Sequence, residues 1–166
     1  MNSPPYSVLF VCTGNSARSI LAEATLNHLG AGRFWAFSAG SRPTGQVNPY
    51  ALRQLERAGI ATSGYRSKSW DQFCGAGGPK LDLVVTVCDS AAQEVCPVLF
   101  GDFIRTHWGL PDPAAVRGSD VEIAHAFAEA HRVIRHRIDQ LLMLPCESLD
   151  EATLRERLDS IGILQP

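Results

Sequence analysis

The chain has 166 residues, of which 45% are hydrophobic and 19% charged, and its formal net charge at pH 7 is −2. This length suits one compact domain, and the composition is typical of a globular protein. The near-neutral charge offers no basic surface for a nucleic acid or an anionic membrane. No apolar run reaches the ~20 residues of a membrane-spanning helix, and the first residues lack a secretory signal pattern, so we expect a cytoplasmic protein.

Short apolar runs alternate along the chain with segments of helical periodicity. The runs predict buried strands over residues 7–11, 35–40 and 81–87, and a weaker strand over 104–108. Helical spacing of apolar residues predicts helices over 19–29, over 49–58 and over about 121–144. This alternation indicates the α/β class, as one three-layer α/β/α domain with a central four-stranded parallel sheet.

The remaining segments predict loops and an added helix. Residues 74–79 and 96–117 are rich in Gly and Pro, which favours loops on either side of the third strand. The last segment predicts a helix over about 148–162 that begins at a Ser148 cap. We interpret residues 1–166 as a single catalytic domain with a core over about 7–144 and this helix as an extension.

The first predicted strand leads into a short loop that combines a thiol with a cation. Five residues separate Cys12 from Arg18, and the pair stands directly before a helix. Backbone N–H groups of such a loop, together with the positive end of the helix, favour binding of an oxyanion. The guanidinium can bridge two oxygens of a tetrahedral anion. The expected oxyanion-binding residues are Thr13, Gly14, Asn15, Ser16, Ala17 and Arg18.

The same loop predicts a reactive Cys12. Backbone dipoles, the helix end and Arg18 all favour the thiolate, so we expect an easily ionised nucleophile. Ser19 is near enough in sequence to donate a hydrogen bond to the sulfur, and the Asn15 amide is expected to brace the loop. The alternative is that Cys12 is simply a buried small residue at the end of a strand.

The stretch VLFVCTGNSARS resembles the active-site loop of the low-molecular-weight protein tyrosine phosphatase superfamily. A second signature of that superfamily is a distant Asp-Pro pair, which matches Asp112-Pro113 here. The resemblance covers residues 7–144 and implies a covalent cysteinyl intermediate, with Asp112 as the general acid. One alternative function is therefore a phosphatase that uses Cys12, Arg18 and Asp112 on phosphotyrosine or small phosphate esters.

Two further cysteines, Cys88 and Cys96, lie in VVTVCDSAAQEVCPVLFG, and a phosphatase needs neither of them. Cys88 ends a predicted strand, so it should lie at the same sheet edge as Cys12, and residues 89–95 favour a short helix. This pair, with the HWG stretch at 107–109, resembles the arsenate reductase branch of the superfamily. Family phosphatases usually carry a tyrosine shortly after the Asp-Pro, where this chain has Ala114, Ala115 and Val116, and this departure disfavours a phosphatase.

The resemblance implies a relay of thiols that serves arsenical resistance. Cys12 attacks arsenate, Asp112 protonates the leaving oxygen, and Cys88 then attacks Cys12 and releases arsenite. Cys96 takes over the disulfide, which is redox-active and is reduced by an external thiol partner. Thioredoxin is the expected reductant, with glutaredoxin, glutathione or mycothiol as alternatives, and phosphate or sulfate should compete with arsenate.

Several alternatives remain open from the sequence. Cys88 and Cys96 could belong to the core or to a zinc site, for which His107 is the nearby candidate ligand. A module that binds oxyanions or senses redox state without catalysis would need no general acid.

Some reductases of this branch hold potassium with an Asn, a Glu, a Ser and an Asp. Asn15, Glu23 and Ser38 match the first three of these, and Lys68 stands at the Asp position unless a shifted alignment places Asp71 there. We expect no bound metal and an ammonium in its place. Cys74 and Cys146 are expected to be bystanders.

Overall fold

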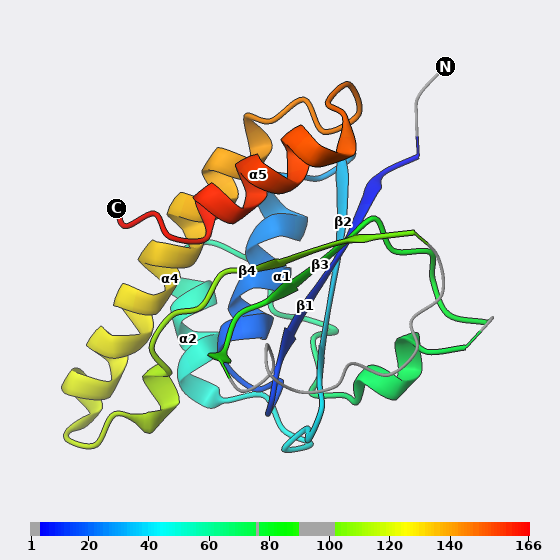
Figure 1. Ribbon diagram of the computed structural model, residues 1–166. Helices are drawn as coiled ribbons and strands as arrows, with labels where there is room; N and C mark the ends of the chain where they lie inside the picture. Colours follow the sequence, from blue (N-terminus) through cyan, green and yellow to red (C-terminus); the bar gives the residue numbers. More distant parts are fainter. Residues whose placement is uncertain (1–3, 76, 90–101) are drawn as a thin grey trace.

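The computed structural model describes residues 4–75, 77–89 and 102–166. Its four strands form one parallel sheet in the order β2-β1-β3-β4 (Figure 1). The strands are β1 (Tyr6–Cys12), β2 (Phe34–Gly40), β3 (Leu83–Thr86) and β4 (Ile104–His107). This confirms the predicted α/β class with a central four-stranded parallel sheet.

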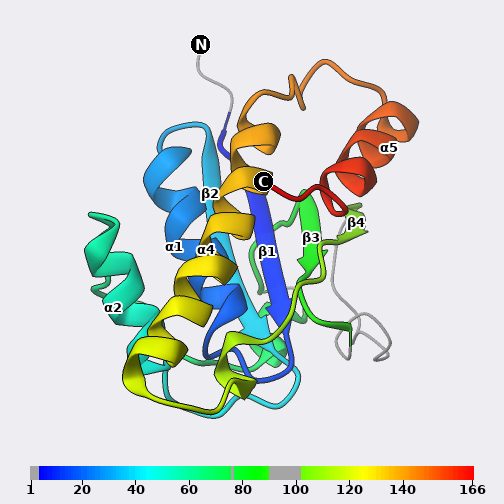
Figure 2. The same ribbon diagram turned by 90° about the vertical axis from the view of Figure 1, so that its left-hand side faces the viewer.

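The helices of the described residues are α1 (Arg18–Leu29), α2 (Pro49–Arg57), α4 (Asp120–Leu142) and α5 (Glu151–Ile161). Helices α1, α2 and α4 pack together on one face of the sheet, whereas α5 lies against the edge strand β4 (Figure 2). Two 3-10 turns, η1 (Trp70–Phe73) and η2 (Pro113–Ala115), complete the list, and η1 lies across the sheet from α1.

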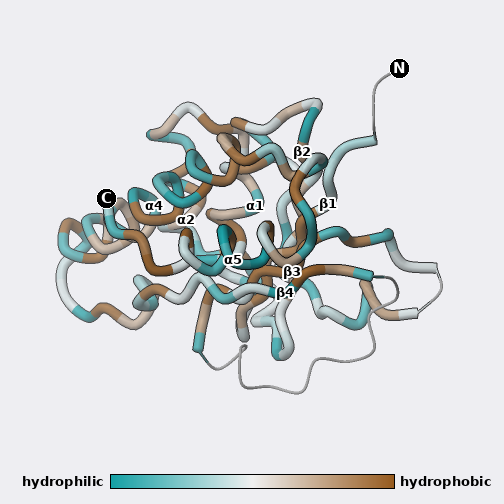
Figure 3. Tube along the Cα trace, turned by 45° about the horizontal axis from the view of Figure 1, so that its top comes forward, coloured by the Kyte–Doolittle hydropathy of each residue, from teal (hydrophilic) through white to brown (hydrophobic). Residues whose placement is uncertain are grey.

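The central strand β1 carries the core. All residues from Val8 to Cys12 are buried, and β3 is buried along its whole length, as expected for strands with neighbours on both sides. Figure 3 shows the hydrophobic colouring along these strands. By contrast, β4 alternates between buried and exposed residues, as an edge strand with one covered face does. Among the described residues, no helix has both the length and the hydropathy needed to cross a bilayer.

The start of the last helix differs from the prediction. Asp150, and not Ser148, caps α5, because its carboxylate accepts a hydrogen bond from the backbone N–H of Thr153 at 2.8 Å. The Ser148 hydroxyl instead donates to the Pro145 carbonyl oxygen at 3.1 Å. Both residue types favour the N-cap position, and here both the backbone N–H and the hydroxyl of Ser148 are bound to the Pro145 carbonyl oxygen.

Because all four strands are parallel, their carboxyl ends lie at one edge of the sheet. Cys12, Gly40, Thr86 and His107 are the last residues of the four strands. Ligands of open α/β sheets bind outside this edge. The fold therefore brings the expected nucleophile to the usual place for a functional site.

Candidate active site

The loop after β1 wraps closely around the Cys12 side chain. Asn15 has a φ of 46°, in the left-handed region that Asn tolerates better than most residues. A side chain at Gly40, the end of β2, would place its Cβ 2.4 Å from the Thr13 carbonyl oxygen. Gly40 is therefore what lets the loop approach the neighbouring strand.

The Cys12 sulfur is buried and held by hydrogen bonds. It lies 2.9 Å from Ser19 Oγ and accepts from the backbone N–H of Asn15 at 3.2 Å. The Asn15 side-chain amide donates to Ser19 Oγ at 2.8 Å, which leaves the Ser19 hydroxyl proton to point at the sulfur. The predicted roles of Ser19 and Asn15 agree with these contacts.

Burial raises the pKa of the Cys12 thiol, and the hydrogen bonds from Ser19 and Asn15 act in the opposite direction. The shift is upward, contrary to the easily ionised thiol expected from the sequence. Cys12 is only 4% exposed, and its desolvation outweighs the hydrogen bonds that favour the thiolate. A negative charge on Cys88 would also raise the pKa of Cys12, although by less than burial does.

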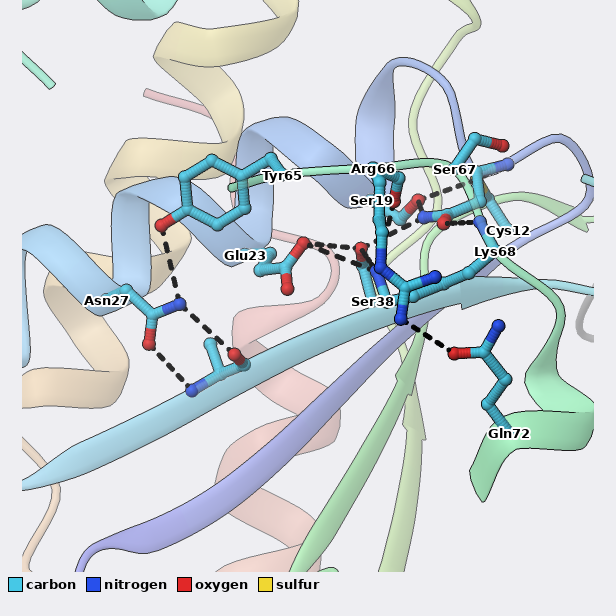
Figure 4. A network of polar contacts seen from close by, with 12 residues as sticks. Cys12, Ser19, Glu23, Asn27, Ser38, Tyr65, Arg66, Ser67, Lys68 and Gln72 are labelled. Atoms are coloured by element: carbon cyan, nitrogen blue, oxygen red, sulfur yellow. Dashed lines mark hydrogen bonds and ion pairs between the residues drawn. The ribbon is translucent and has the colours of Figure 1, made fainter. Parts of the chain in front are cut away.

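A buried polar network braces the loop from behind (Figure 4). The Asn15 amide donates to Ser19 and to Ser38 Oγ at 3.0 Å, and its oxygen accepts from the Lys68 backbone N–H at 2.9 Å. Ser38 in turn donates to Glu23 Oε1 at 2.6 Å. All hydrogen-bonding groups of the Asn15 side chain are thus engaged, which fixes both its orientation and the loop.

The Lys68 ammonium lies inside this network. Its Nζ donates to Ser38 Oγ at 3.3 Å and to the Arg66 carbonyl oxygen at 3.1 Å, and lies 3.9 Å from Glu23 Oε1. Burial lowers the pKa of Lys68 and raises that of Glu23, while each charge favours the other. An ammonium thus stands among the oxygens that would have to surround a potassium ion, so the side chains as placed do not fit that ion.

Arg18 faces the loop that carries the Asp-Pro pair. Its Nη1 donates to the Leu110 carbonyl oxygen at 2.9 Å, and its Nη2 lies 3.6 Å from Asp112 Oδ2. The other Asp112 oxygen accepts from the backbone N–H of Ala114 at 2.9 Å and starts η2. Arg18 and Asp112, 94 positions apart in the sequence, therefore meet at the mouth of the Cys12 loop.

A cleft of about 810 Å³ opens between these elements. Cys88 lines it and is itself 4% exposed, and its sulfur lies 3.5 Å from the hydroxyl of Thr13, the residue after Cys12. The structure thus brings Cys12, Arg18, Asp112 and Cys88 to one end of the sheet. Cys96, like most of the helix expected over 89–95, lies outside the described residues.

The remaining cysteines lie away from this cleft. Cys74 Sγ donates to the Trp70 carbonyl oxygen at 3.4 Å, and burial raises the pKa of Cys146. Within residues 4–75, 77–89 and 102–166, no cluster of three His, Cys, Asp or Glu side chains could hold a metal ion. His107 contacts Thr86 and Asp89, not a cysteine, in its described hydrogen bonds.

Two groups of cleft residues were not predicted. Gly162 and Ile163, after α5, line the cleft together with His107 and Asp89. The extension carries no motif, so its sequence gives no signal of this position. His107 could have been placed there, because the last residues of neighbouring parallel strands lie side by side.

Comparison with known proteins places this geometry in context. The profile of the low molecular weight phosphotyrosine protein phosphatase family matches residues 7–156. An arsenate reductase of Halalkalibacterium halodurans is 38% identical over 131 residues, which span 79% of this chain and 91% of that protein.

Solved structures give the same picture. An arsenate reductase in a phosphate-binding state is 28% identical, with a TM-score of 0.63 over 82% of this chain and 96% of that one. A thioredoxin-dependent arsenate reductase of Corynebacterium glutamicum is 26% identical, with a TM-score of 0.56 over 84% of this chain and 64% of that one.

Proposed function

Because the chain belongs to the low molecular weight phosphotyrosine protein phosphatase family, we propose that it acts as its relatives named arsenate reductase do and converts arsenate to arsenite. The observation that carries the proposal is the position of Cys88. Its thiol lines the same cleft as Arg18 and Asp112 and contacts Thr13, beside Cys12. Phosphate ester hydrolysis would give this second thiol no task.

The first step is nucleophilic attack by Cys12. The Cys12 thiolate, stabilised by Ser19 and by the backbone N–H of Asn15, attacks arsenic and forms an S–As bond. Asp112 donates a proton to the arsenate oxygen that leaves as water. Arg18 is 3.6 Å from Asp112 and positioned to bind the remaining oxygens through its planar fork.

The second step reduces arsenic. The Cys88 thiolate attacks Cys12 Sγ, so that an S–S bond forms and the S–As bond breaks with its electron pair retained by arsenic. Arsenic passes from the +5 to the +3 state, two thiols are oxidised, and arsenite leaves. Cys96 then attacks Cys88, which frees Cys12 and leaves a Cys88–Cys96 disulfide.

An external dithiol must reduce that disulfide before the next cycle. Thioredoxin is the partner we propose, and the thioredoxin-dependent relative from Corynebacterium glutamicum supports this choice. Glutaredoxin, glutathione and mycothiol are the alternatives. The protein itself then needs no bound cofactor, because its own thiols supply the two electrons of each turnover.

The test is arsenite release from arsenate by the reduced protein, with and without thioredoxin, thioredoxin reductase and NADPH. Continuous release with the complete system is the expected result, and one arsenite per enzyme without it. Cys12→Ser should abolish release, and Cys88→Ser should stop it after the arsenate adduct has formed. Rapid hydrolysis of an aryl phosphate without any arsenite would show a phosphatase instead.

A further inference from the structure

One set of contacts in the cleft has no task in the relay described above. His107 ends β4 and pairs in register with Thr86, the last residue of β3. Its Nδ1 lies 2.7 Å from Thr86 Oγ1, and its Nε2 lies 3.0 Å from Oδ1 of Asp89. Cys88 stands between these two partners in the sequence. The imidazole thus spans the turn that carries the second thiol.

The hydrogen-bonding chemistry makes this contact directional. A carboxylate can only accept, so His107 Nε2 carries the proton that binds Asp89. In the neutral imidazole, Nδ1 then accepts from the Thr86 hydroxyl. One ring therefore binds the residue after Cys88 and the end of the strand before it.

Other contacts fix the two residues that follow His107 in the chain. The Trp108 N–H donates to the Thr86 carbonyl oxygen at 2.7 Å, and the indole N–H donates to the Leu158 carbonyl oxygen at 2.9 Å. The buried Arg137 donates through Nη1 to the carbonyl oxygens of Trp108 and Gly109 at 2.9 and 3.0 Å. Helix α4 thus holds the backbone that follows His107, and α5 holds the Trp108 side chain.

Gly109 is a second observation that points to the same contact. A Cβ at this position would lie 2.6 Å from His107 Nε2 and 3.0 Å from Asp89 Oδ1. A side chain here would collide with the two atoms that form the hydrogen bond. Glycine at this position keeps the space in which His107 reaches Asp89.

We propose that His107 is a positioning residue that holds the Cys88 turn against the Cys12 loop for the second chemical step. The inference rests on the proposed arsenate reduction and adds a role within it. His107 acts through Asp89 and Thr86 and exchanges no proton or electron with the reacting atoms. What it supplies is the alignment of the Cys88 sulfur with the S–As adduct, since a misplacement of about 1 Å can cost ~100-fold in rate.

The test is a single-turnover burst of arsenite measured against arsenate concentration. Asp89→Ala removes the acceptor from a side chain that is 86% exposed, so the fold should tolerate it. We expect the maximal burst rate to fall about 10-fold or more, within the range that misalignment produces, while half-saturating arsenate stays unchanged. Gly109→Ala should have the same effect without altering either hydrogen-bonding partner.

Two amide variants of His107 separate its two contacts, because each keeps a polar atom near the position of only one ring nitrogen. His107→Gln can still donate to Asp89 and should retain most of the burst rate, whereas His107→Asn keeps only the Thr86 contact and should resemble Asp89→Ala. His125→Asn, at an exposed position of α4, is the matched control. A wild-type burst rate in Asp89→Ala, or a parallel rise in half-saturating arsenate, would overturn the inference. Absence of arsenite from the wild-type protein would instead refute the proposed function.

Discussion

Replacing Lys68 by Met should destabilise the protein in a way that depends strongly on pH. The substitution keeps the length and most of the volume of the side chain but removes the ammonium. Glu23 then loses its cation, 3.9 Å away, and keeps the hydrogen bond from Ser38. The side chains of Lys68 and Glu23 are both 9% exposed, so water cannot replace the lost charge.

The expected cost follows from this burial. Removing one partner of a buried ion pair costs about 3–5 kcal/mol, and the remaining Ser38 hydroxyl favours the lower end, about 3 kcal/mol. Burial already raises the pKa of Glu23, and loss of Lys68 raises it further. A carboxyl with a raised pKa is stable in the fold when protonated and loses that stability as pH rises through its folded-state pKa. The deficit of Lys68→Met should therefore be large at pH 8 and small at pH 5.

Urea unfolding at the two pH values measures this deficit. Lys80→Met, which removes the exposed lysine of the chain, is the matched control and should change stability by less than about 0.5 kcal/mol. Glu23→Gln combined with Lys68→Met completes a double-mutant cycle, and we expect the second change to recover much of the loss at pH 8. Equal deficits at pH 5 and pH 8, or no coupling between the two sites, would refute the reasoning.

Three further predictions concern the loop, the relay and a buried histidine. Gly40→Ala should push Thr13 away from β2 and lower arsenite release by about 10-fold or more, since loop misplacement of ~1 Å is enough; an unchanged rate would show that the loop yields freely. Cys96→Ser should release one arsenite per enzyme and then stop, and continued turnover with thioredoxin would contradict the relay. Burial lowers the pKa of His131 to about 4, so the fold should lose about 2.5 kcal/mol as pH falls from 7.5 to 4.5. Urea titrations of His131→Gln should show a smaller loss, and an identical one would place the acid sensitivity elsewhere.

The catalytic loop could be predicted because its information is local. Cys12, Arg18 and the strand and helix around them lie within one continuous stretch, so spacing and periodicity suffice. Cys88 could be placed at the same edge because parallel strands end together. In each case a residue's position follows from the element it terminates.

Contacts between segments that are distant in the sequence were harder to predict. Nothing in the sequence shows that His107 reaches Asp89, because this contact depends on side-chain direction after two segments have packed. The position of the Lys68 ammonium beside Ser38 was expected only from the family resemblance, since no local spacing connects these two residues. The prediction that the Cys12 pKa would be lowered was wrong for a related reason. Local dipoles can be counted in the sequence, but the desolvation of a sulfur depends on everything that covers it.

The buried Arg137 has a consequence for how the molecule opens. Its guanidinium binds the carbonyl oxygens of Trp108 and Gly109 and, through Nε, that of Leu164 at 3.3 Å. If the segment that follows α5 detached alone, this buried cation would lose the Leu164 carbonyl oxygen, which is costly. In native-state hydrogen exchange, the amide protons of Trp108 and Gly162 should therefore be released in one cooperative event. Local breathing of the C-terminal helix and of the cleft wall would then be a single motion.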